Sequence, residues 1–387
     1  MRILHLTSEY PPFLLGGLGT HVTELTKALS EIENINITVC AWKYPTAADT
    51  KLSRPNKVSY MLAEHIFDYS PINGAHEILL SNFGVISKVL SENKKFDIIH
   101  AHDFVSGYAG LTLKQILKIP FVVTLHDTIL GRTKSLGNQL TPFNELFSNT
   151  QIGLVNNSNL TICVSSSLKD EIKSLYKVEH NNIKVVHNGI TPLDIKKENY
   201  YLNKQIKILF LGRFAPEKGI VDLIDAVYQL RNEGIDILLN LVGRINNYAH
   251  ELGKKIDTLN LNDCILFKGF LSGTELTNEI INSDLCVIPS WYEPFGIVAI
   301  EACSLGLPVI ATDVGGLGET IKNEVTGIKI PSKHPESIIK ACKRLIQDDN
   351  LRIKLGTSAR KYVNKNYTWN HIAKKTLVLY EKLLNNN

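Results

Sequence analysis

The chain has 387 residues, a hydrophobic fraction of 44%, a charged fraction of 21% and a formal net charge of +4. This length favours two domains, and the composition is that of an ordinary globular protein. So small a net charge gives no support to nucleic-acid binding. The six scattered cysteines show no CxxC or other metal-binding spacing, so we expect buried free thiols in a reducing compartment.

The first residues lead directly into a predicted strand at 2–8, without the layout of a signal peptide. No apolar run approaches membrane-spanning length, so we expect a cytoplasmic protein. The glycine-rich stretch Gly16-Gly17-Leu18-Gly19 follows, and from Thr20 the apolar residues fall at helical spacings. Strand, glycine loop and helix can cradle a phosphate, but a plain tight turn explains the glycines equally well. The full GxGxxG fingerprint is absent.

Buried strand-like runs alternate with helical patterns along both halves of the chain. Strands are predicted at 35–42, 97–102, 120–126, 160–165 and 183–186, and then at 206–211, 235–242, 264–270, 285–289 and 308–312. This alternation predicts an α/β protein with a doubly wound parallel sheet in each half. Ligands bind such sheets at the carboxyl ends of the strands, so the informative residues should directly follow strands.

The expected organisation is an N-terminal domain at 1–190, a polar linker at 191–205, a C-terminal domain at 206–366 and a tail at 367–387. From Trp369 the tail has an amphipathic pattern, which indicates a helix that packs along the domains. A basic membrane-surface helix is the alternative, and it would need a stronger segregation of apolar residues.

Two glutamates frame the stretch in which we expect a ligand. Glu293 precedes a Pro-Phe-Gly turn, and Glu301 follows with seven residues between the two. Pro294 suits a helix entrance, and the amides of Gly296, Ile297 and Val298 would open that helix. Carboxylates on both sides of anion-binding amides suit a molecule with hydroxyls at both ends and phosphates between, such as a nucleotide sugar.

A second candidate segment, Gly212-Arg213-Phe214-Ala215-Pro216-Glu217-Lys218-Gly219, follows the first strand of the second half. Arg213 and Lys218 bracket a turn and could neutralise a diphosphate. The guanidinium group of Arg213 would form two parallel hydrogen bonds, and the ammonium group of Lys218 would act as a compact positive charge. Two solvated surface charges are the alternative. The Glu293 turn, at the end of another strand in the same predicted sheet, favours phosphate binding.

Histidines and aspartates end two strands of the first half. His126 could bond a sugar hydroxyl, or its backbone carbonyl could face a developing cation; a core histidine is the alternative. His102 and Asp103 could line the acceptor side, although Asp103 is better interpreted as a helix cap. A metal site is not expected, because these residues come from separate strand ends and form no compact motif.

These motifs resemble those of the retaining nucleotide-sugar glycosyltransferases of family 4, over nearly the whole chain. EPFGIVAIE, GRFAPEKG and DVGGLGE carry the likeness. SEYPP, GGLG, HAHD and TLHD are most similar to the branch of glycogen and starch synthases and maltose-1-phosphate synthases. The resemblance implies the GT-B fold, in which two doubly wound Rossmann-like domains face each other across a cleft.

The resemblance also implies roles for individual residues. Arg213 and Lys218 would hold the donor's diphosphate, and Glu301 would bond the ribose hydroxyls. Glu293 would bond the transferred sugar, together with amides that also meet the phosphates. Those amides belong to Phe295, Gly296, Ile297 and Val298. Such enzymes need no metal and no cofactor, because the nucleoside diphosphate (NDP) sugar is a co-substrate.

In the N-terminal half, the Gly16-Gly17 loop would close over the diphosphate, and His126 would lie beside the anomeric region of the sugar. One position departs from the glycogen and starch synthases, which usually carry a lysine where this chain has Leu14. This difference weakens the case for polymer synthesis and for ADP-glucose as the donor. The loops at 45–74 and 131–142 would contact the acceptor, a carbohydrate or another hydroxyl compound, and residues 242–244 and 269–271 would border the base.

The expected reaction moves a hexose, of the glucose type, from an NDP-sugar to an acceptor hydroxyl with retention. Asp127 is the nearest candidate nucleophile by sequence, but it follows a strand-end histidine. The resemblance implies front-face substitution, which is the account favoured for the family. Arg213→Ala and Lys218→Ala should then lower transfer far more than fold stability. The alternatives are an NDP-sugar 2-epimerase of the same fold and a non-catalytic subunit that binds a glycan or stabilises a partner. Membrane association is possible but not indicated.

Overall fold

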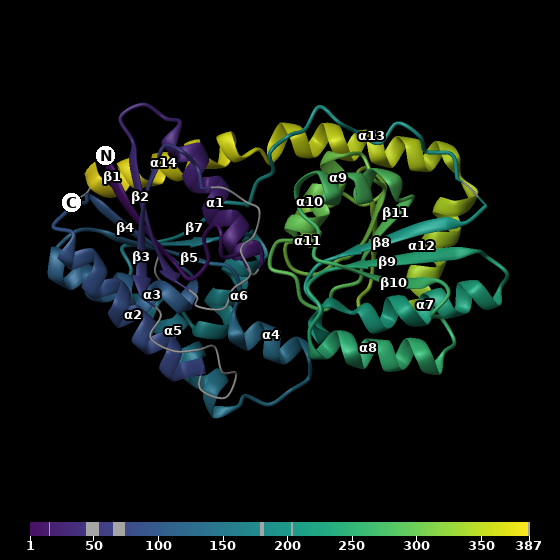
Figure 1. Cartoon of the computed structure of the whole chain (residues 1–387), viewed down its shortest axis with the longest axis horizontal. Helices are drawn as coiled ribbons and strands as arrows, with labels where there is room; N and C mark the ends of the chain where they lie inside the picture. Colours follow the sequence, from purple (N-terminus) through teal and green to yellow (C-terminus); the bar gives the residue numbers. More distant parts are fainter. Residues whose placement is uncertain (15, 44–53, 65–73, 179–181, 203, 386–387) are drawn as a thin grey trace. The chain divides into compact units, whose positions relative to one another are not determined.

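The structure is a computed structural model that describes the chain except for residues 15, 44–53, 65–73, 179–181, 203 and 386–387. It divides into two compact units (Figure 1). Unit 1 comprises Met1–Lys134, Asn138–Gly189 and Trp369–Asn387, and unit 2 comprises Ser135–Gly137 and Ile190–Thr368.

Unit 1 is built on a parallel sheet with the strand order β3-β2-β1-β4-β5-β6-β7. Its strands are β1 (Arg2–Thr7), β2 (Asn36–Lys43), β3 (Val58–Glu64), β4 (Ile98–His102), β5 (Phe121–Leu125), β6 (Leu160–Cys163) and β7 (Ile183–Val185). Its helices are α1 (Gly17–Ser30), α2 (Gly74–Ser91), α3 (Asp103–Leu117), α4 (Ile129–Ser135), α5 (Pro142–Asn157), α6 (Ser166–Tyr176) and α14 (Trp369–Asn385). The strand order reverses between β1 and β4, and a ligand site of a doubly wound sheet lies at such a switch point.

The tail helix α14 packs within unit 1. Its residues Ile372 and Tyr380 share one buried core with Val22 and Leu25 of α1 and with apolar residues of the sheet. This packing explains the amphipathic pattern of the tail, because one face of α14 meets α1 and the core while the opposite face is polar.

Unit 2 repeats the design with the strand order β10-β9-β8-β11-β12-β13, again parallel. Its strands are β8 (Ile206–Leu211), β9 (Ile237–Val242), β10 (Ile265–Gly269), β11 (Leu285–Ile288), β12 (Val309–Thr312) and β13 (Ile328–Ile330). Its helices are η1 (Pro216–Lys218), α7 (Ile220–Asn232), α8 (Asn247–Thr258), α9 (Gly273–Asn282), α10 (Ile297–Ser304), α11 (Leu317–Thr320), α12 (Pro335–Gln347) and α13 (Asp349–Asn366). Here the order reverses between β8 and β11.

The expected α/β fold with two doubly wound parallel sheets is confirmed. The predicted strands agree with the observed ones to within a few residues, but β3 and β13 were not predicted. Parts of the poorly assigned 45–74 loop lie outside the described residues. The expected domain ranges stay predictions.

The segment expected as a linker, 191–205, belongs to unit 2 and is anchored there. The buried Lys197 donates from Nζ to the carbonyl of Ser283 at 2.6 Å. The buried Arg352 donates from Nη2 to the carbonyl of Tyr200 at 2.9 Å. Buried cations that bond backbone carbonyls hold this polar segment against unit 2.

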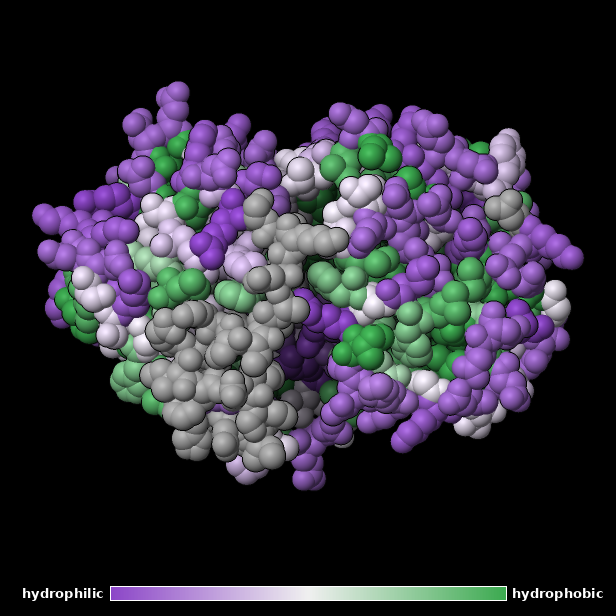
Figure 2. Space-filling view, viewed as in Figure 1, coloured by the Kyte–Doolittle hydropathy of each residue, from purple (hydrophilic) through white to green (hydrophobic). Residues whose placement is uncertain are grey.

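The described surface in Figure 2 is largely hydrophilic, with scattered apolar patches on both units. None of the described helices is both long enough and apolar enough to cross a bilayer. All six cysteines are buried and free, as predicted.

Candidate functional site

The two loops that the sequence singled out in unit 2 meet at the switch point of its sheet. One loop follows β8 and the other follows β11, and these strands are neighbours. The N–H groups of Trp291 and Tyr292 both donate to the carbonyl of Glu217, at 2.7 and 3.3 Å. Gly219, with φ of +64°, lies so close to the second loop that a Cβ there would be 2.0 Å from the carbonyl oxygen of Pro289. The loops therefore form one connected structure.

Lys218 and Glu293 form the central ion pair of this structure. Lys218 donates from Nζ to Oε2 of Glu293 at 2.8 Å, and Ser290 donates from Oγ to the same oxygen at 3.2 Å. The two charged side chains are only 14% and 11% exposed. Because the pair is largely withdrawn from water, each charge depends on the other or on a ligand that can replace it.

Arg213 lies at the exposed side of the same loop. Its side chain is 56% exposed, and Nη2 donates to Oε1 of Glu217 at 3.1 Å. Glu217 itself is buried, so its carboxylate orients the guanidinium while its backbone carbonyl fixes the other loop. No signal in the sequence distinguishes Glu217, because a charged residue between a proline and a lysine is typical of a solvated turn.

The turn behind Glu293 leads into α10 through Gly296, which has φ of +92°. The helix begins at Ile297, so the prediction that Pro294 occupies its first turn is wrong. The left-handed conformation of Gly296 turns the chain into the helix after the proline. A Cβ at Gly296 would also lie 2.5 Å from Leu317 Cδ2. The first N–H groups of α10, from Ile297 and Val298, have no intrahelical acceptor and suit an anion.

Glu301 lies in the second turn of α10, and its side chain leans back toward that helix start. Burial raises the pKa of its carboxyl group from 4.5 to about 7. A hydrogen-bond donor such as a sugar hydroxyl would stabilise the ionised form and offset part of this shift.

A third loop supports Glu293 from β12. Gly316 donates its N–H to the carbonyl of Glu293 at 2.9 Å. A Cβ at Gly315 would lie 2.2 Å from that same carbonyl oxygen, and one at Gly316 would lie 2.3 Å from Phe295 Cα. The DVGGLGE motif carried the family likeness, and the structure adds the reason for its first two glycines, which is backbone contact with the turn behind Glu293.

The loops after β9 and β10 adjoin the same edge. Gly243 donates its N–H to the carbonyl of Gly269 at 3.0 Å, and the Arg244 guanidinium lies 4.7 Å from the centre of the Phe270 ring. A cation over an aromatic face forms a flat surface. The assignment of these residues to the base stays a prediction.

In unit 1, the glycine loop is held by an acidic residue of the SEYPP motif. Gly16 caps α1 and donates its N–H to Oε2 of Glu9 at 2.9 Å. A Cβ at Gly19 would meet Leu14 Cδ2 at 2.5 Å and Glu9 Oε2 at 2.9 Å. Gly17 is the first residue of the helix. The glycine at position 19 therefore lets these two side chains pack closely against α1.

The acidic residues at the ends of β4 and β5 have separate partners. The N-cap of α3 is His102, so the expected capping role of Asp103 is wrong. Asp103 is the first helical residue, with φ of +64°, and its Oδ1 accepts from the N–H of Phe104 at 2.7 Å. Burial and the neighbouring Asp127 raise the pKa of the Asp103 carboxyl to about 8. Asp127 forms an ion pair with Arg132 at 3.2 Å.

The rings of His102 and His126 face inward in unit 1. His102 Nε2 lies 3.0 Å from His5 Nδ1, and the His126 ring lies edge-on to His21 with their centres 4.6 Å apart. The structure thus brings together Lys218 and Glu293, with Arg213 and Glu301 on the adjoining elements of unit 2. It gathers His102 and His126 in a histidine cluster of unit 1. The catalytic and binding roles of all these residues stay predictions.

Known proteins match both halves of the chain. The family model "Glycosyltransferase Family 4" matches residues 15–192, and the model "Glycosyl transferases group 1" matches residues 193–362. An uncharacterised glycosyltransferase of Methanocaldococcus jannaschii is 31% identical over 98% of this chain and 98% of that protein. The chain therefore belongs to the family 4 glycosyltransferases, with the GT-B fold.

Further relatives extend over both units. The glycogen synthase of Mycobacterium tuberculosis is 28% identical over 98% of this chain and 94% of its own length. The sucrose-phosphate synthase of Thermosynechococcus elongatus has a similar structure, with a TM-score of 0.86, 22% identity and full coverage of both chains. The structure of Anabaena Alr3699/HepE in complex with UDP-glucose has a TM-score of 0.74 at 21% identity, with 99% of each chain covered.

Proposed function

We propose that this chain is a retaining hexosyltransferase that moves a hexose of the glucose type from an NDP-sugar to an acceptor hydroxyl. The observation that carries the proposal is the Lys218–Glu293 pair at the switch point of unit 2, held at 2.8 Å beside the start of α10. The Lys218 ammonium group and the amides at the start of α10 suit the diphosphate of such a donor, and the Glu293 carboxylate suits its hydroxyls. The glycogen synthase relative and the UDP-glucose complex of a similar fold support this donor class.

In this proposal the donor extends along the ends of β8, β11 and α10. Lys218 and Arg213 meet the diphosphate, and the amides of Ile297 and Val298 complete its solvation. Glu301 accepts from the ribose hydroxyls, and Glu293 accepts from hydroxyls of the transferred sugar. Because Glu293 already accepts from Lys218 through Oε2, its second oxygen is the one directed to the sugar. The charge at this site is met by protein groups, so the proposed transfer needs no metal there.

The proposed transfer is a front-face substitution. The bond between the anomeric carbon and the diphosphate oxygen breaks while the acceptor oxygen bonds the same face, and the acceptor proton passes to the departing phosphate. Asp127 is a poor nucleophile for a double displacement, since its carboxylate is paired with Arg132. The backbone carbonyl of His126 is the group proposed to face the developing positive charge, because the ring Nε2 is buried within the protein. Positioning and stabilisation of the leaving diphosphate then supply most of the rate.

Thermal unfolding of the purified chain with a panel of nucleotides and NDP-sugars tests the donor site. A ligand of the native state at a hundredfold excess over its Kd should add about 2.7 kcal/mol to the apparent stability. One NDP and its sugar should shift the transition, and the shift should vanish in the Lys218→Ala variant. If no member of the panel shifts it, the donor site is not as proposed.

The donor that binds is then incubated with and without candidate acceptors, and the products are followed by NMR. A new glycoside with the anomeric configuration of the donor would support retention, whereas the opposite configuration would contradict it. Release of an epimerised sugar without any acceptor would contradict the transferase proposal.

A further inference from the structure

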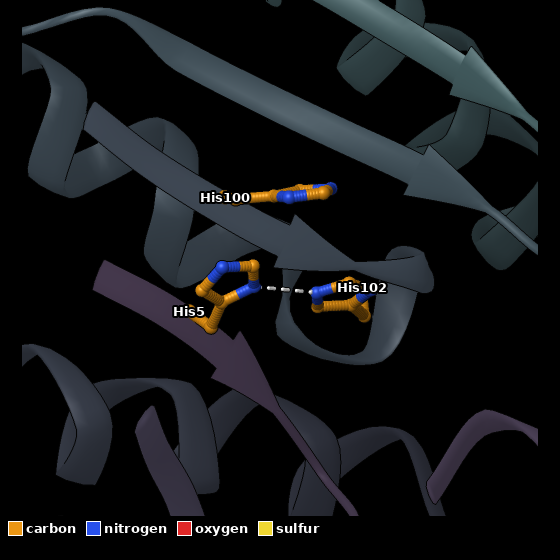
Figure 3. Close-up of side chains that lie close together, drawn as sticks. All are labelled: His5, His100 and His102. Carbon is orange, nitrogen blue, oxygen red and sulfur yellow. Dashed lines mark hydrogen bonds between the residues drawn. The ribbon is translucent and has the colours of Figure 1, made fainter. Parts of the chain in front are cut away.

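A cluster of histidine rings lies on one face of the unit 1 sheet. His5 of β1 and His100 of β4 are register neighbours, and His102 follows two residues later on the same face of β4. Figure 3 shows these rings side by side, with His5 Nδ1 and His102 Nε2 hydrogen-bonded at 3.0 Å. His21 of α1 and His126 after β5 extend the cluster. The proposed transfer makes no use of these ring nitrogens.

Three of these rings are arranged as ligands of one ion. His21, His102 and His126 can each direct one nitrogen so that the three atoms lie within 4.8 Å of one another. Their ring centres are 5.2, 4.6 and 5.9 Å apart. With zinc–nitrogen bonds of about 2.0–2.1 Å and tetrahedral angles, the centres of bound imidazoles also lie about 5 Å apart. The spacing of the three rings is therefore compatible with one bound ion.

The tautomer of His21 leaves a bare nitrogen in the cluster. Its Nδ1 lies 2.6 Å from Oδ1 of the buried Asn188. An amide oxygen only accepts, so Nδ1 carries the proton and Nε2 of the neutral ring holds a lone pair. This Nε2 is buried and has no hydrogen-bond partner among the described residues. Orientation of a ligating histidine through its other nitrogen is a regular feature of metal sites.

The hydrogen bond between His5 and His102 leaves buried ring nitrogens without a partner among the described residues, whichever of the two histidines donates. The buried His102 Nδ1 and His5 Nε2 have no partner within the described part of the chain. If His5 donates, the N–H of His102 Nδ1 lacks an acceptor; if His102 donates, its Nδ1 is a bare lone pair. A buried polar atom without a partner costs about 1–3 kcal/mol. In the second arrangement a cation at His102 Nδ1 removes the cost of that atom, while the N–H of His5 Nε2 still lacks an acceptor among the described residues.

We propose that His21, His102 and His126 bind one divalent transition-metal ion of the zinc class within unit 1. The ligand atoms are Nε2 of His21, Nδ1 of His102 and Nε2 of His126. Imidazole donors favour this class over magnesium or calcium, and three ligands leave one position for solvent or an anion. The other close triad, with His5 and His100, is a poorer site, because both nitrogens of His100 are bonded to hydroxyl groups of Tyr380 and Thr124.

Such an ion would tie together three elements of unit 1, namely the helix behind the glycine loop and the ends of β4 and β5. It would not replace Lys218 or Arg213, which belong to unit 2. The proposal is therefore independent of the donor chemistry, and either can fail alone.

The test uses the untagged full chain, stripped with a chelator and dialysed. Zn²⁺ is titrated in competition with a chromophoric chelator, bound metal is counted by mass spectrometry, and Co²⁺ serves as a spectroscopic substitute. We expect one ion per chain and the intense visible absorption of tetrahedral Co²⁺. His21→Gln should abolish this absorption. Asn188→Ala, which removes only the partner that orients His21, should weaken binding by roughly 10–100-fold.

His250→Gln is the matched control, because His250 is an exposed histidine of α8 in unit 2. It should leave both affinity and spectrum unchanged. Should His21→Gln not fold, His126→Gln provides the same measurement, since His126 is less deeply buried. Wild-type protein without a stoichiometric ion, or equal binding by the wild type and a folded cluster variant, would overturn the proposal and leave a hydrogen-bonded cluster with water.

Discussion

The Nζ atom of Lys218 lies 2.8 Å from Oε2 of Glu293, although these residues are 75 positions apart in the chain. Both follow neighbouring strands of unit 2, and both side chains are largely buried. Without a ligand, each charge neutralises the other. A diphosphate would compete for the ammonium group, and a sugar hydroxyl would compete for the carboxylate, so the pair is suited to binding both at once.

Lys218→Ala should abolish most transfer and also destabilise unit 2. Loss of one charge that stabilises the leaving group costs about 10²–10³ in kcat. Glu293 would be left as a poorly solvated charge, and we expect a loss of unfolding free energy of about 3 kcal/mol, since the pair is largely buried. Steady-state kinetics and urea unfolding measure the two effects. The prediction from sequence, that Lys218→Ala lowers transfer far more than fold stability, is tested by comparing these two losses.

The double variant Lys218→Ala/Glu293→Gln separates these effects. Removal of both charges should restore most of the stability and none of the activity, because no charge is left unpaired. Lys255→Ala is the control, since Lys255 pairs with Asp225 at a partly exposed position. Activity that returns with stability in the double variant would contradict the catalytic role of Lys218.

Arg213→Ala should lower kcat and destabilise unit 2 less than Lys218→Ala does. The Arg213 side chain is 56% exposed, so its ion pair is weak, although its loss leaves the buried Glu217 carboxylate without that partner. If the guanidinium binds the diphosphate of the transition state, its loss should again cost about 10²–10³ in rate. Arg231→Ala, which removes another surface pair, serves as the control. Equal kcat values for the two variants would exclude Arg213 from the site.

Donor affinity should rise with pH through the pKa of Glu301. Burial raises that pKa to about 7 in the folded protein. The contribution of the protonated carboxyl group to the unfolding free energy is therefore fully present below about pH 4.5 and is lost as the pH rises through 7. Hydroxyl donors of the ribose prefer the ionised carboxylate, so binding should release a proton below pH 7. Each unit below the pKa leaves about tenfold less ionised group. Calorimetry with an NDP-sugar should therefore give weaker binding at pH 6 than at pH 8.

Glu301→Gln tests the source of this pH dependence. The amide cannot ionise, so its affinity should be lower at pH 8 and nearly flat between pH 6 and pH 8. As the pH rises from 6 to 8, the unfolding free energy of the wild type should also fall relative to that of this variant. A variant that keeps the full pH dependence would assign the titration to another group.

The strands buried on both faces were predictable, and so were the edge strands β7 and β10. β4 and β5 are short, wholly buried runs of strand length, and a polar residue directly follows each of them. β3 and β13 are edge strands, and β13 has only three residues with Lys329 partly exposed between two isoleucines. An edge strand needs less apolar sequence, because one side lacks a neighbour and the faces are partly solvated.

Within the site, strand ends were predictable but side-chain partners were not. The sequence placed Lys218 and Glu293 at one edge of a sheet, yet only the left-handed turn at Gly219 and the contact of the two loops show that they pair. Likewise, the histidines of unit 1 come from separate segments, which argued against a metal site. The parallel register of β1 and β4 brings His5 beside His100, and no local spacing encodes that contact.

Gly315→Ala should damage the donor site through the backbone of Glu293. Gly315 has φ of +51°, and an added Cβ would lie 2.2 Å from the Glu293 carbonyl oxygen. The left-handed conformation costs on the order of 1–3 kcal/mol for a residue with a Cβ, and the clash adds to it. Gly234→Ala has a similar φ of +84° with nothing within 4 Å of the new Cβ, so it reports the conformational cost alone.

We expect Gly315→Ala to lose more unfolding free energy than Gly234→Ala and to bind the donor more weakly. The clash must move either the third loop or the turn that carries Glu293, and both movements break the 2.9 Å bond from Gly316 to Glu293. Urea unfolding and donor titration of both variants make the comparison. Equal losses of stability with intact donor binding in both would mean that this loop does not position Glu293, and the support for the carboxylate would have to come from Ser290 and Lys218 alone.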